Sequence, residues 1–179
     1  MPNLDYNEDN KTVEWINGIK YMSPSPHPNH GRVYSKIFNK IFNYLEGKSC
    51  EVFPDKTDLS LSDPQSPINI VDIKQPLVPD LFVVCDKKYE LVGNNIVAIP
   101  DFVCEIVSPS SIKIDNVIKK ELYLSKGVRE YWIVNYFDKS ITVCFDGKER
   151  TFSFQDEVKV NIFNDLNICL KDIRLFEEN

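Results

Sequence analysis

Short apolar runs separated by turn-forming residues make up much of the chain and predict a protein rich in β-strands. The runs at 13–16 and 19–22 flank Asn17-Gly18, and an Asn-Gly pair in this setting is a strong signal for a β-hairpin. Asp146-Gly147 predicts another turn. Further strands are predicted at 51–53, 58–61, 81–85, 102–107, 130–135, 141–145, 151–154 and 158–160, and residues 166–176 are predicted as a strand that runs into a final helical turn.

Two segments instead carry apolar residues at helical spacing. The first helix is predicted to begin at Asn29 or His30, after a proline-rich linker, and to end at Gly47. The second follows a run of serine and proline at 108–111 and is predicted to end at Gly127, with a buried stripe of Ile114, Ile118 and Leu122. Between the two helices, residues 62–76 are predicted as a loop with a short strand at 68–73, and residues 86–100 as an exposed connection.

The order of these elements predicts an α/β (α+β) fold. The strand at 102–107, the second helix and the strand at 130–135 form a strand–helix–strand crossover, so these two strands should lie parallel in one sheet. A chain of 179 residues and 20.8 kDa is long enough to bury a substantial core. We therefore expect a single domain over residues 1–179, with a loose N-terminal tip at 1–12.

Composition narrows the class of protein. Hydrophobic residues make up 42% of the chain and charged residues 27%, which is ordinary for a globular protein in water. No apolar run reaches the roughly 20 residues needed to cross a bilayer, and the N-terminal residues lack the pattern of a signal peptide, so we expect a cytoplasmic protein with no membrane partner. The cysteines form no C-x-x-C pair; we expect no zinc site and predict that they are small buried hydrophobes: Cys50, Cys85, Cys104, Cys144 and Cys169.

The overall charge counts against a nucleic-acid partner. The chain carries a net charge of −6, whereas proteins that contact phosphates usually present a basic surface. The charge is uneven, however, because five basic residues between Lys113 and Arg129 are accompanied only by Asp115 and Glu121. A local basic patch on an acidic protein is therefore an open alternative.

Two carboxylates stand out because they adjoin or interrupt strongly apolar strands. Asp80 lies at the start of the run 81–85, and Glu105 lies inside the run 102–107. If these strands form a hairpin, position 80 lies opposite 105 or 106, and residues opposite one another on antiparallel strands have Cβ atoms about 4.5–5.5 Å apart. Two carboxylates that close must shift a pKa, share a proton or hold a cation.

The second helix brings a cation to the same region. Asp115, Lys119 and Tyr123 follow at four-residue intervals beside the apolar stripe, so they should lie along the contact between helix and sheet. Two acids and a lysine on a strand–turn–strand–helix unit form the layout of a metal-dependent nuclease site. Structural alternatives stay open for each residue: Glu105 as a buried acid paired with Lys119, Asp80 as a turn aspartate, and Lys119 as an exposed partner of Asp115.

Together these motifs resemble those of the Uma-type restriction endonucleases of bacteria, which belong to the PD-(D/E)xK nuclease superfamily. The resemblance is carried by P-D-L-F-V-V-C at 79–85, P-D-F-V-C-E-I-V-S-P-S at 100–110 and D-x-x-x-K-x-x-x-Y-x-x-x-G-V-x-E-Y-W-I-V at 115–134. It extends from an M-S-P-S-P segment at 22–26 to residues 166–176 and so covers nearly the whole chain. It implies a restriction-endonuclease-like core, in which two main helices flank a mixed central β-sheet with extra N- and C-terminal strands.

The resemblance also implies a site and a reaction. Asp80 would be the metal-binding aspartate, Glu105 would be the acid of the (D/E)xK element, and the carbonyl of Ile106 would join them as a ligand of Mg²⁺ or Mn²⁺. Lys119 would be the catalytic lysine, and DNA would be the substrate. Three further residues are accessory candidates: His30, Asp115 and Lys120.

Two positions depart from the pattern of the superfamily. Val107 stands where the (D/E)xK element has its lysine, and the resemblance implies that the lysine role has moved to Lys119 on the following helix. Asn135 stands where relatives usually carry aspartate, and we do not expect this difference to affect the site.

We carry two hypotheses for function. The first is a metal-dependent DNA endonuclease that hydrolyses phosphodiester bonds. The alternative, motivated by Val107 and the acidic charge, is a catalytically inactive nuclease fold that binds DNA or dimerises. The apolar strands at 130–135 and 141–145 are predicted to be edge strands, so a homodimer is compatible with either hypothesis. A metal-free hydrolase has little support, because the sequence contains no G-x-S-x-G motif, no P-loop and only two histidines.

Overall fold

The fold is built on a six-stranded sheet in the order β11-β10-β9-β8-β5-β3. The computed structural model describes residues 12–23, 27–67, 70–107 and 114–177, so the predicted tip falls outside it apart from its last residue. Strands β8 and β9 are parallel, as predicted from the crossover between them, and the other neighbours in this sheet are antiparallel. The strands are β3 (Cys50–Phe53), β5 (Leu81–Cys85), β8 (Phe102–Val107), β9 (Glu130–Asn135), β10 (Ser140–Phe145) and β11 (Lys148–Ser153).

Smaller sheets surround the central one. The predicted N-terminal hairpin is confirmed as β1 (Thr12–Ile16) and β2 (Ile19–Ser23), joined by Asn17 and Gly18 with positive φ angles. A three-stranded sheet has the order β4-β7-β6 and is formed by β4 (Asp58–Leu61), β6 (Tyr89–Val92) and β7 (Asn95–Ala98). A short pair, β12 (Val158–Lys159) and β13 (Asn167–Ile168), lies near the C-terminus.

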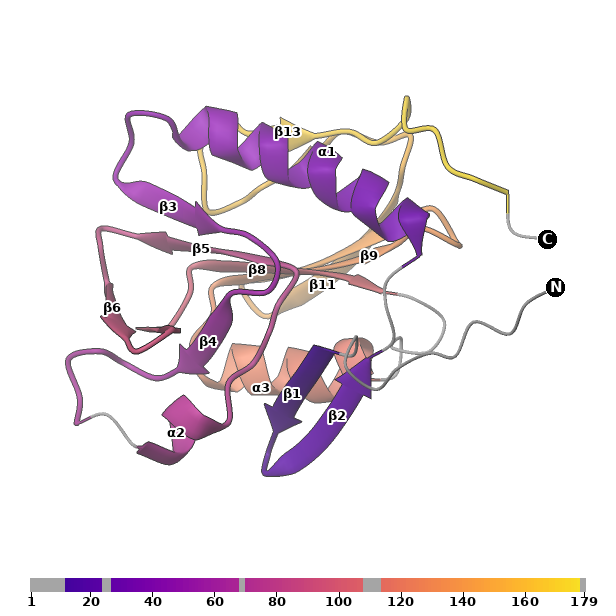
Figure 1. The fold of residues 1–179 in the computed structure, drawn as a ribbon. Helices are drawn as coiled ribbons and strands as arrows, with labels where there is room; N and C mark the ends of the chain where they lie inside the picture. The colour runs from indigo at the N-terminus through magenta and orange to yellow at the C-terminus, as the bar shows by residue number, and fades with distance from the viewer. Residues whose placement is uncertain (1–11, 24–26, 68–69, 108–113, 178–179) are drawn as a thin grey trace, which may run out of the picture.

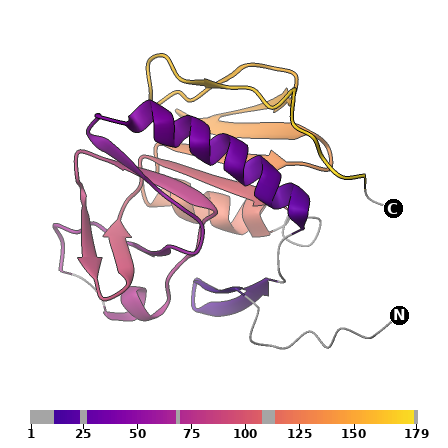
Figure 2. The same ribbon diagram turned by 45° about the horizontal axis from the view of Figure 1, so that its top comes forward.

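The central sheet separates two hydrophobic cores (Figures 1 and 2). Helix α1 (Pro28–Leu45) and the C-terminal segment cover one face, where Val33, Ile37 and Ile41 pack against the sheet. Helix α3 (Lys120–Ser125), the three-stranded sheet and the N-terminal hairpin lie on the other face. Strand β8 is buried on both faces along its whole length, which explains its nearly continuous apolar sequence.

The second helix differs from its predicted form. The described part begins as a π-helix at Ile114–Lys119 and continues as α3. The fully buried residues are Lys119 and Tyr123, whereas Ile118 and Leu122 are only half-buried. Ile118 and Leu122 of the predicted stripe do pack against the core, but the most deeply buried side chains of the described part lie one position later, at Lys119 and Tyr123. A π-helix takes more residues per turn than an α-helix, so it changes which side chains face the sheet.

Three other predictions are corrected. Residues 70–74 form a short helix, α2 (Ile70–Lys74), where a strand was predicted. The predicted exposed connection at 86–100 contains β6 and β7, because residues 95–98 are buried against β4. The tail after β13 has a hydrogen-bonded turn from Leu170 to Ile173 and continues to residue 177 without helix.

Strands β9 and β10, which were predicted as sheet edges that could support a homodimer, are interior strands. Each pairs on both sides within the six-stranded sheet. The edges of this sheet are β3 and β11, so the structural argument for a dimer through β9 or β10 was wrong. The described part of the chain contains no helix that is long and apolar enough to span a membrane.

The cysteines also differ from prediction. Cys50 and Cys85 form a disulfide between directly paired residues of β3 and β5. Cys104 and Cys144 are buried free thiols, as expected, and Cys169 is partly exposed. Burial, with a contribution from the nearby Glu149 charge, raises the pKa of Cys144 to about 11, so this thiol stays protonated at neutral pH.

We predict that the disulfide stabilises the edge of the sheet. It joins residues 35 positions apart, and closing a loop of this length corresponds to about 4 kcal/mol of unfolding free energy in the chain-entropy model. Oxidised protein should be two hydrogen masses lighter than reduced protein by intact-mass spectrometry, and Cys85→Ser should lower the urea midpoint. An oxidised sample with the mass of the fully reduced chain would contradict the pairing.

A buried carboxylate holds the C-terminal segment to the sheet. Glu130, at the start of β9, is completely buried, and its carboxylate accepts hydrogen bonds from Trp132 Nε1 at 2.7 Å, Asn161 Nδ2 at 2.9 Å and the Ile162 N–H at 2.9 Å. These donors would be left without an acceptor in Glu130→Ala. We predict a loss of about 3 kcal/mol or more, seen as a fall in Tm of roughly 6–12 °C. Glu149→Ala, which removes an exposed ion pair with Lys120, is the matched control and should change Tm little.

Candidate active site

Asp80 connects three parts of the fold. It lies directly before β5, and its Oδ2 accepts a hydrogen bond from the backbone N–H of Ile106 in β8 at 2.6 Å. Its Oδ1 lies 2.9 Å from Nε2 of His30, in the first turn of α1. The Asp80 side chain is 19% exposed, so it is the more accessible of the two candidate carboxylates.

Glu105 is the acid inside β8. Strands β5 and β8 are antiparallel neighbours with Leu81 opposite Cys104, and one further step in this register places Asp80 opposite Glu105. The predicted alternation is also confirmed, because Val103 and Val107 belong to the core on the α3 side of the sheet. The Glu105 side chain is only 4% exposed, so its charge must be compensated by polar groups within the protein.

That compensation comes from the second helix. Lys119 Nζ lies 3.1 Å from Oε1 of Glu105, and the Tyr123 hydroxyl donates to the same oxygen at 3.2 Å. Lys119 is itself buried, with a side chain 5% exposed. The four-residue spacing of Lys119 and Tyr123 brings both polar ends to one carboxylate oxygen. Tyr123, to which the sequence analysis gave no role in the site, therefore contacts Glu105 directly.

The two carboxylates share an electrostatic environment around Cys104. Burial first, and then the negative charges of Asp80 and Glu105, raise the pKa of the Cys104 thiol well above its ordinary value. The raised pKa keeps the thiol protonated, which makes Cys104 unsuited to act as a nucleophile.

The backbone of Ile106 contributes to the same place. In a β-strand the N–H and C=O of one residue point to the same neighbouring strand. Since the Ile106 N–H reaches Asp80, the Ile106 carbonyl is directed toward the end of β5 as well. Asp80, Glu105 and this carbonyl could therefore supply oxygen ligands of the kind that Mg²⁺ and Mn²⁺ prefer.

The candidate site suits a divalent ion because of the type of its ligand atoms, which are oxygens, and not because many side chains surround the ion. Within the described ranges, no three His, Cys, Asp or Glu side chains are grouped so that they could hold a metal ion. Mg²⁺ usually keeps several waters and binds through one or two carboxylates and substrate phosphates, so a site with two acids is sufficient for it. The donor set therefore fits a hard divalent cation and does not fit zinc.

The accessory candidates have different positions. His30 contacts Asp80, whereas Lys120 pairs with Glu149 of β11 at 2.9 Å and so points to another strand. The side chain of Asp115 lies outside what the structure describes. Tyr34, one turn after His30, was missed by sequence reasoning. Burial first, together with the charges of Asp55 and Asp80, raises the pKa of its phenol.

The basic cluster predicted between residues 113 and 129 is largely neutralised within the fold. Lys119 pairs with Glu105 and Lys120 with Glu149, while Arg129 Nη1 lies 3.0 Å from Oδ1 of Asp101. Lys113 lies outside the described residues. Among the described residues of this segment, Lys126 is exposed and forms none of these ion pairs.

Comparison with known proteins gives a family and a fold. A family model described as "Uma2: Putative restriction endonuclease" matches residues 1–171. A crystal structure described as "a putative nuclease belonging to DUF820" from Anabaena variabilis is similar at a TM-score of 0.71 and 18% identity, over 90% of this chain and 88% of that chain. This likeness is one of fold, and it confirms the predicted mixed sheet between two helices. No curated protein matches the chain.

We predict that the Glu105–Lys119 pair is strongly coupled in stability. Lys119→Met should cost about 3–5 kcal/mol, because it leaves a buried carboxylate without its cation. Adding Glu105→Gln to that variant should restore most of the loss, since the remaining amide is neutral. Urea unfolding of the two single variants and the double variant measures the coupling. Additive losses would show that the two groups do not interact in solution.

Proposed function

The chain belongs to the Uma2 family, as its motifs predicted, and on that premise we propose that it is a divalent-metal-dependent endonuclease that hydrolyses phosphodiester bonds in DNA. The observation that carries this proposal is that Asp80 bonds the Ile106 N–H of β8 while Lys119 pairs with the adjacent Glu105 of the same strand. A buried acid paired with a lysine, next to a second and more accessible carboxylate, is more typical of a functional site than of a surface turn.

In this proposal Asp80, Glu105 and the carbonyl of Ile106 hold Mg²⁺ or Mn²⁺. When bound, the ion supplies positive charge next to the scissile phosphate and lowers the pKa of a coordinated water. His30 orients the Asp80 carboxylate through its contact with Oδ1. Tyr123 orients Glu105, because its hydroxyl donates to Oε1.

Lys119 replaces the lysine that Val107 removes from the strand. Its ammonium approaches Glu105 from the following helix. A lysine at position 107 would point to the same face of the sheet, because residues two apart in a strand share a face. Lys119 thus brings positive charge to the face where the motif lysine would lie. Its proposed role is to stabilise the negative charge that develops on the phosphate during attack. Burial strengthens this interaction, because few waters screen the ammonium.

A second candidate function follows from the same burial. An ion pair this deep can be purely structural, and a nuclease fold with Val107 in its motif could bind DNA without cutting it. Measuring metal binding distinguishes the nuclease from the non-catalytic module. Titration calorimetry with Mn²⁺ should show binding that Asp80→Asn abolishes if the site is catalytic, and no binding if the fold is only a DNA-binding or dimerising module. A homodimer stays a prediction that sedimentation of the purified protein would test.

We predict cleavage of plasmid DNA in Mg²⁺ or Mn²⁺ that stops when EDTA is added. Asp80→Asn and Glu105→Gln should each reduce the cleavage rate by about 100-fold or more, because each removes a negative charge that holds the ion. Glu149→Gln is the matched control, since it removes an exposed carboxylate away from these residues and should keep the rate of the unmodified protein. Undiminished cleavage by folded Glu105→Gln would rule out this site.

The Lys119 role needs a variant that stays folded. Lys119→Arg keeps the positive charge beside Glu105, so it should stay folded and retain part of the cleavage rate if the cation acts on the phosphate. Rates are measured on a fluorescent duplex at fixed salt. A Lys119→Met protein that is folded and cleaves at the rate of the unmodified chain would show that this ammonium takes no part in the reaction.

A further inference from the structure

Helix α1 has a charge opposite to that of the protein as a whole. Its 18 residues contain Arg32, Lys36 and Lys40 and no acidic residue, whereas the full chain has a net charge of −6. The three basic residues are four positions apart, so they lie along one side of the helix. All three are exposed. Three basic residues of the segment at 113–129 form ion pairs within the fold, whereas the basic residues of α1 are presented on the surface.

Neutral polar side chains accompany this basic row. Ser35 and Asn39 are also four positions apart, are exposed and lie next to Arg32 and Lys36 on the outer side of α1. Phosphate contacts in protein–DNA complexes come mainly from arginine, lysine, serine and asparagine side chains of this kind. The outer surface of α1 therefore carries the types of side chain that contact the phosphate backbone of DNA in known complexes.

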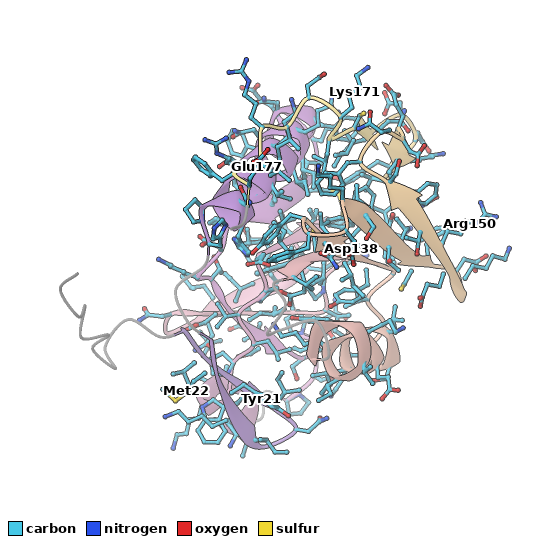
Figure 3. All side chains as sticks on the ribbon, turned by 90° about the vertical axis from the view of Figure 1, so that its right-hand side faces the viewer. Tyr21, Met22, Asp138, Arg150, Lys171 and Glu177 are labelled. Atoms are coloured by element: carbon cyan, nitrogen blue, oxygen red, sulfur yellow. A yellow bond between two sulfur atoms is a disulfide. The ribbon has the colours of Figure 1, made fainter. Side chains whose placement is uncertain are left out.

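The C-terminal tail turns this surface into a groove. A groove of about 750 Å³ runs between α1 and the tail, and we call it the basic groove; its charged and amide lining is Arg32, Lys36, Asn39, Asp172 and Arg174. In Figure 3 the tail passes over α1, with Lys171 and Glu177 marking its course. The lining contains three cations and one carboxylate, so its net charge is positive.

The wall of the basic groove is fixed by specific contacts. Asn29 is buried in the first turn of α1, and its amide bonds both backbone groups of Phe176: Nδ2 donates to the carbonyl at 3.0 Å, and Oδ1 accepts from the N–H at 2.7 Å. Arg32 donates to the carbonyl of Arg174, and its guanidinium lies 3.9 Å from the centre of the Phe176 ring. The tail is therefore held against α1 without using Lys36 or Lys40.

Lys36, which lines the basic groove, and Lys40, one turn further along α1, are exposed cations that the tail contacts leave available. Throughout the described ranges neither of them forms an ion pair, in contrast to Lys119, Lys120 and Arg129. An exposed row of unneutralised charge attracts anions, and a polyanion gains most because it contacts several of the charges at once.

The groove and the candidate active site meet at the same turn of α1. Pro28 and Gly31 line the groove, while His30 between them contacts Asp80. Resting on the proposed function, we propose that the basic groove binds the phosphodiester backbone of the DNA substrate beside the scissile bond. Contact along α1 gives the protein its affinity and sets the direction of the strand, while Asp80 and Glu105 act on the bond that reaches the first turn.

The test is DNA binding by a protein that cannot cut. In EDTA, with Glu105→Gln as background, the affinity for a short fluorescein-labelled duplex is measured by anisotropy over a range of salt concentrations. Adding Lys36→Gln with Lys40→Gln should weaken binding about tenfold at low salt and reduce the slope of log K against log salt by about two. Both side chains are exposed, so the Tm should not change.

A matched control separates local contact from overall charge. Lys148→Gln with Arg150→Gln makes the same change in net charge on β11, at the far edge of the sheet, where Figure 3 shows Arg150 pointing away from α1. This control should keep the affinity and the salt slope of the background protein. Equal weakening by both double variants, or no weakening by the α1 variant, would overturn the groove while leaving cleavage by the unmodified chain intact. An unmodified chain that neither cuts nor binds DNA would overturn the proposed function and the groove together.

Discussion

The burial of a carboxylate in the middle of the central sheet is the constraint on which the rest of this structure depends. Strand β8 is covered on both faces, and Glu105 is its single charged residue. A charge in that position is tolerated only when hydrogen-bonding groups and an opposite charge are brought to it. Lys119 and Tyr123 meet that need. The path of the second helix, including its π-helical start, is therefore linked to the same carboxylate.

The topology of the sheet explains why a site forms at this place. The parallel pair of β8 and β9 requires a crossover, and the crossover carries the helix that returns Lys119 to β8. Strand β5 starts just after Asp80. The Asp80 side chain therefore lies at the beginning of this strand, where it accepts a hydrogen bond from the Ile106 N–H of β8. Helix α1 then closes the arrangement from the opposite face through His30. Residues distant in sequence thus converge through ordinary rules of sheet and helix packing.

The charge of this protein is distributed unevenly over its surface, so the net charge does not describe every region. A net charge of −6 argues against binding to a polyanion, and the basic residues near the crossover are used in ion pairs. Helix α1 nevertheless presents basic residues with no acid among them. Because electrostatic attraction is screened within about 8–10 Å at physiological salt, a partner senses the local surface more than the distant acids. An acidic chain can therefore carry a surface suited to DNA.

The sequence by itself determined most of the strands, the first helix, the parallel crossover and the family, and it predicted that Asp80 lies opposite position 105 or 106 of the neighbouring strand. These features follow from local periodicity, turn chemistry and motif spacing, which are written in short segments. The tertiary structure alone decided the Cys50–Cys85 disulfide, the burial of β6 and β7, the interior place of β9 and β10, and the role of Tyr123 at Glu105. Each of these depends on which distant segments become neighbours, and no local pattern specifies that. The phase of the second helix belongs to the same group, because its π-turn changes which side chains face the sheet.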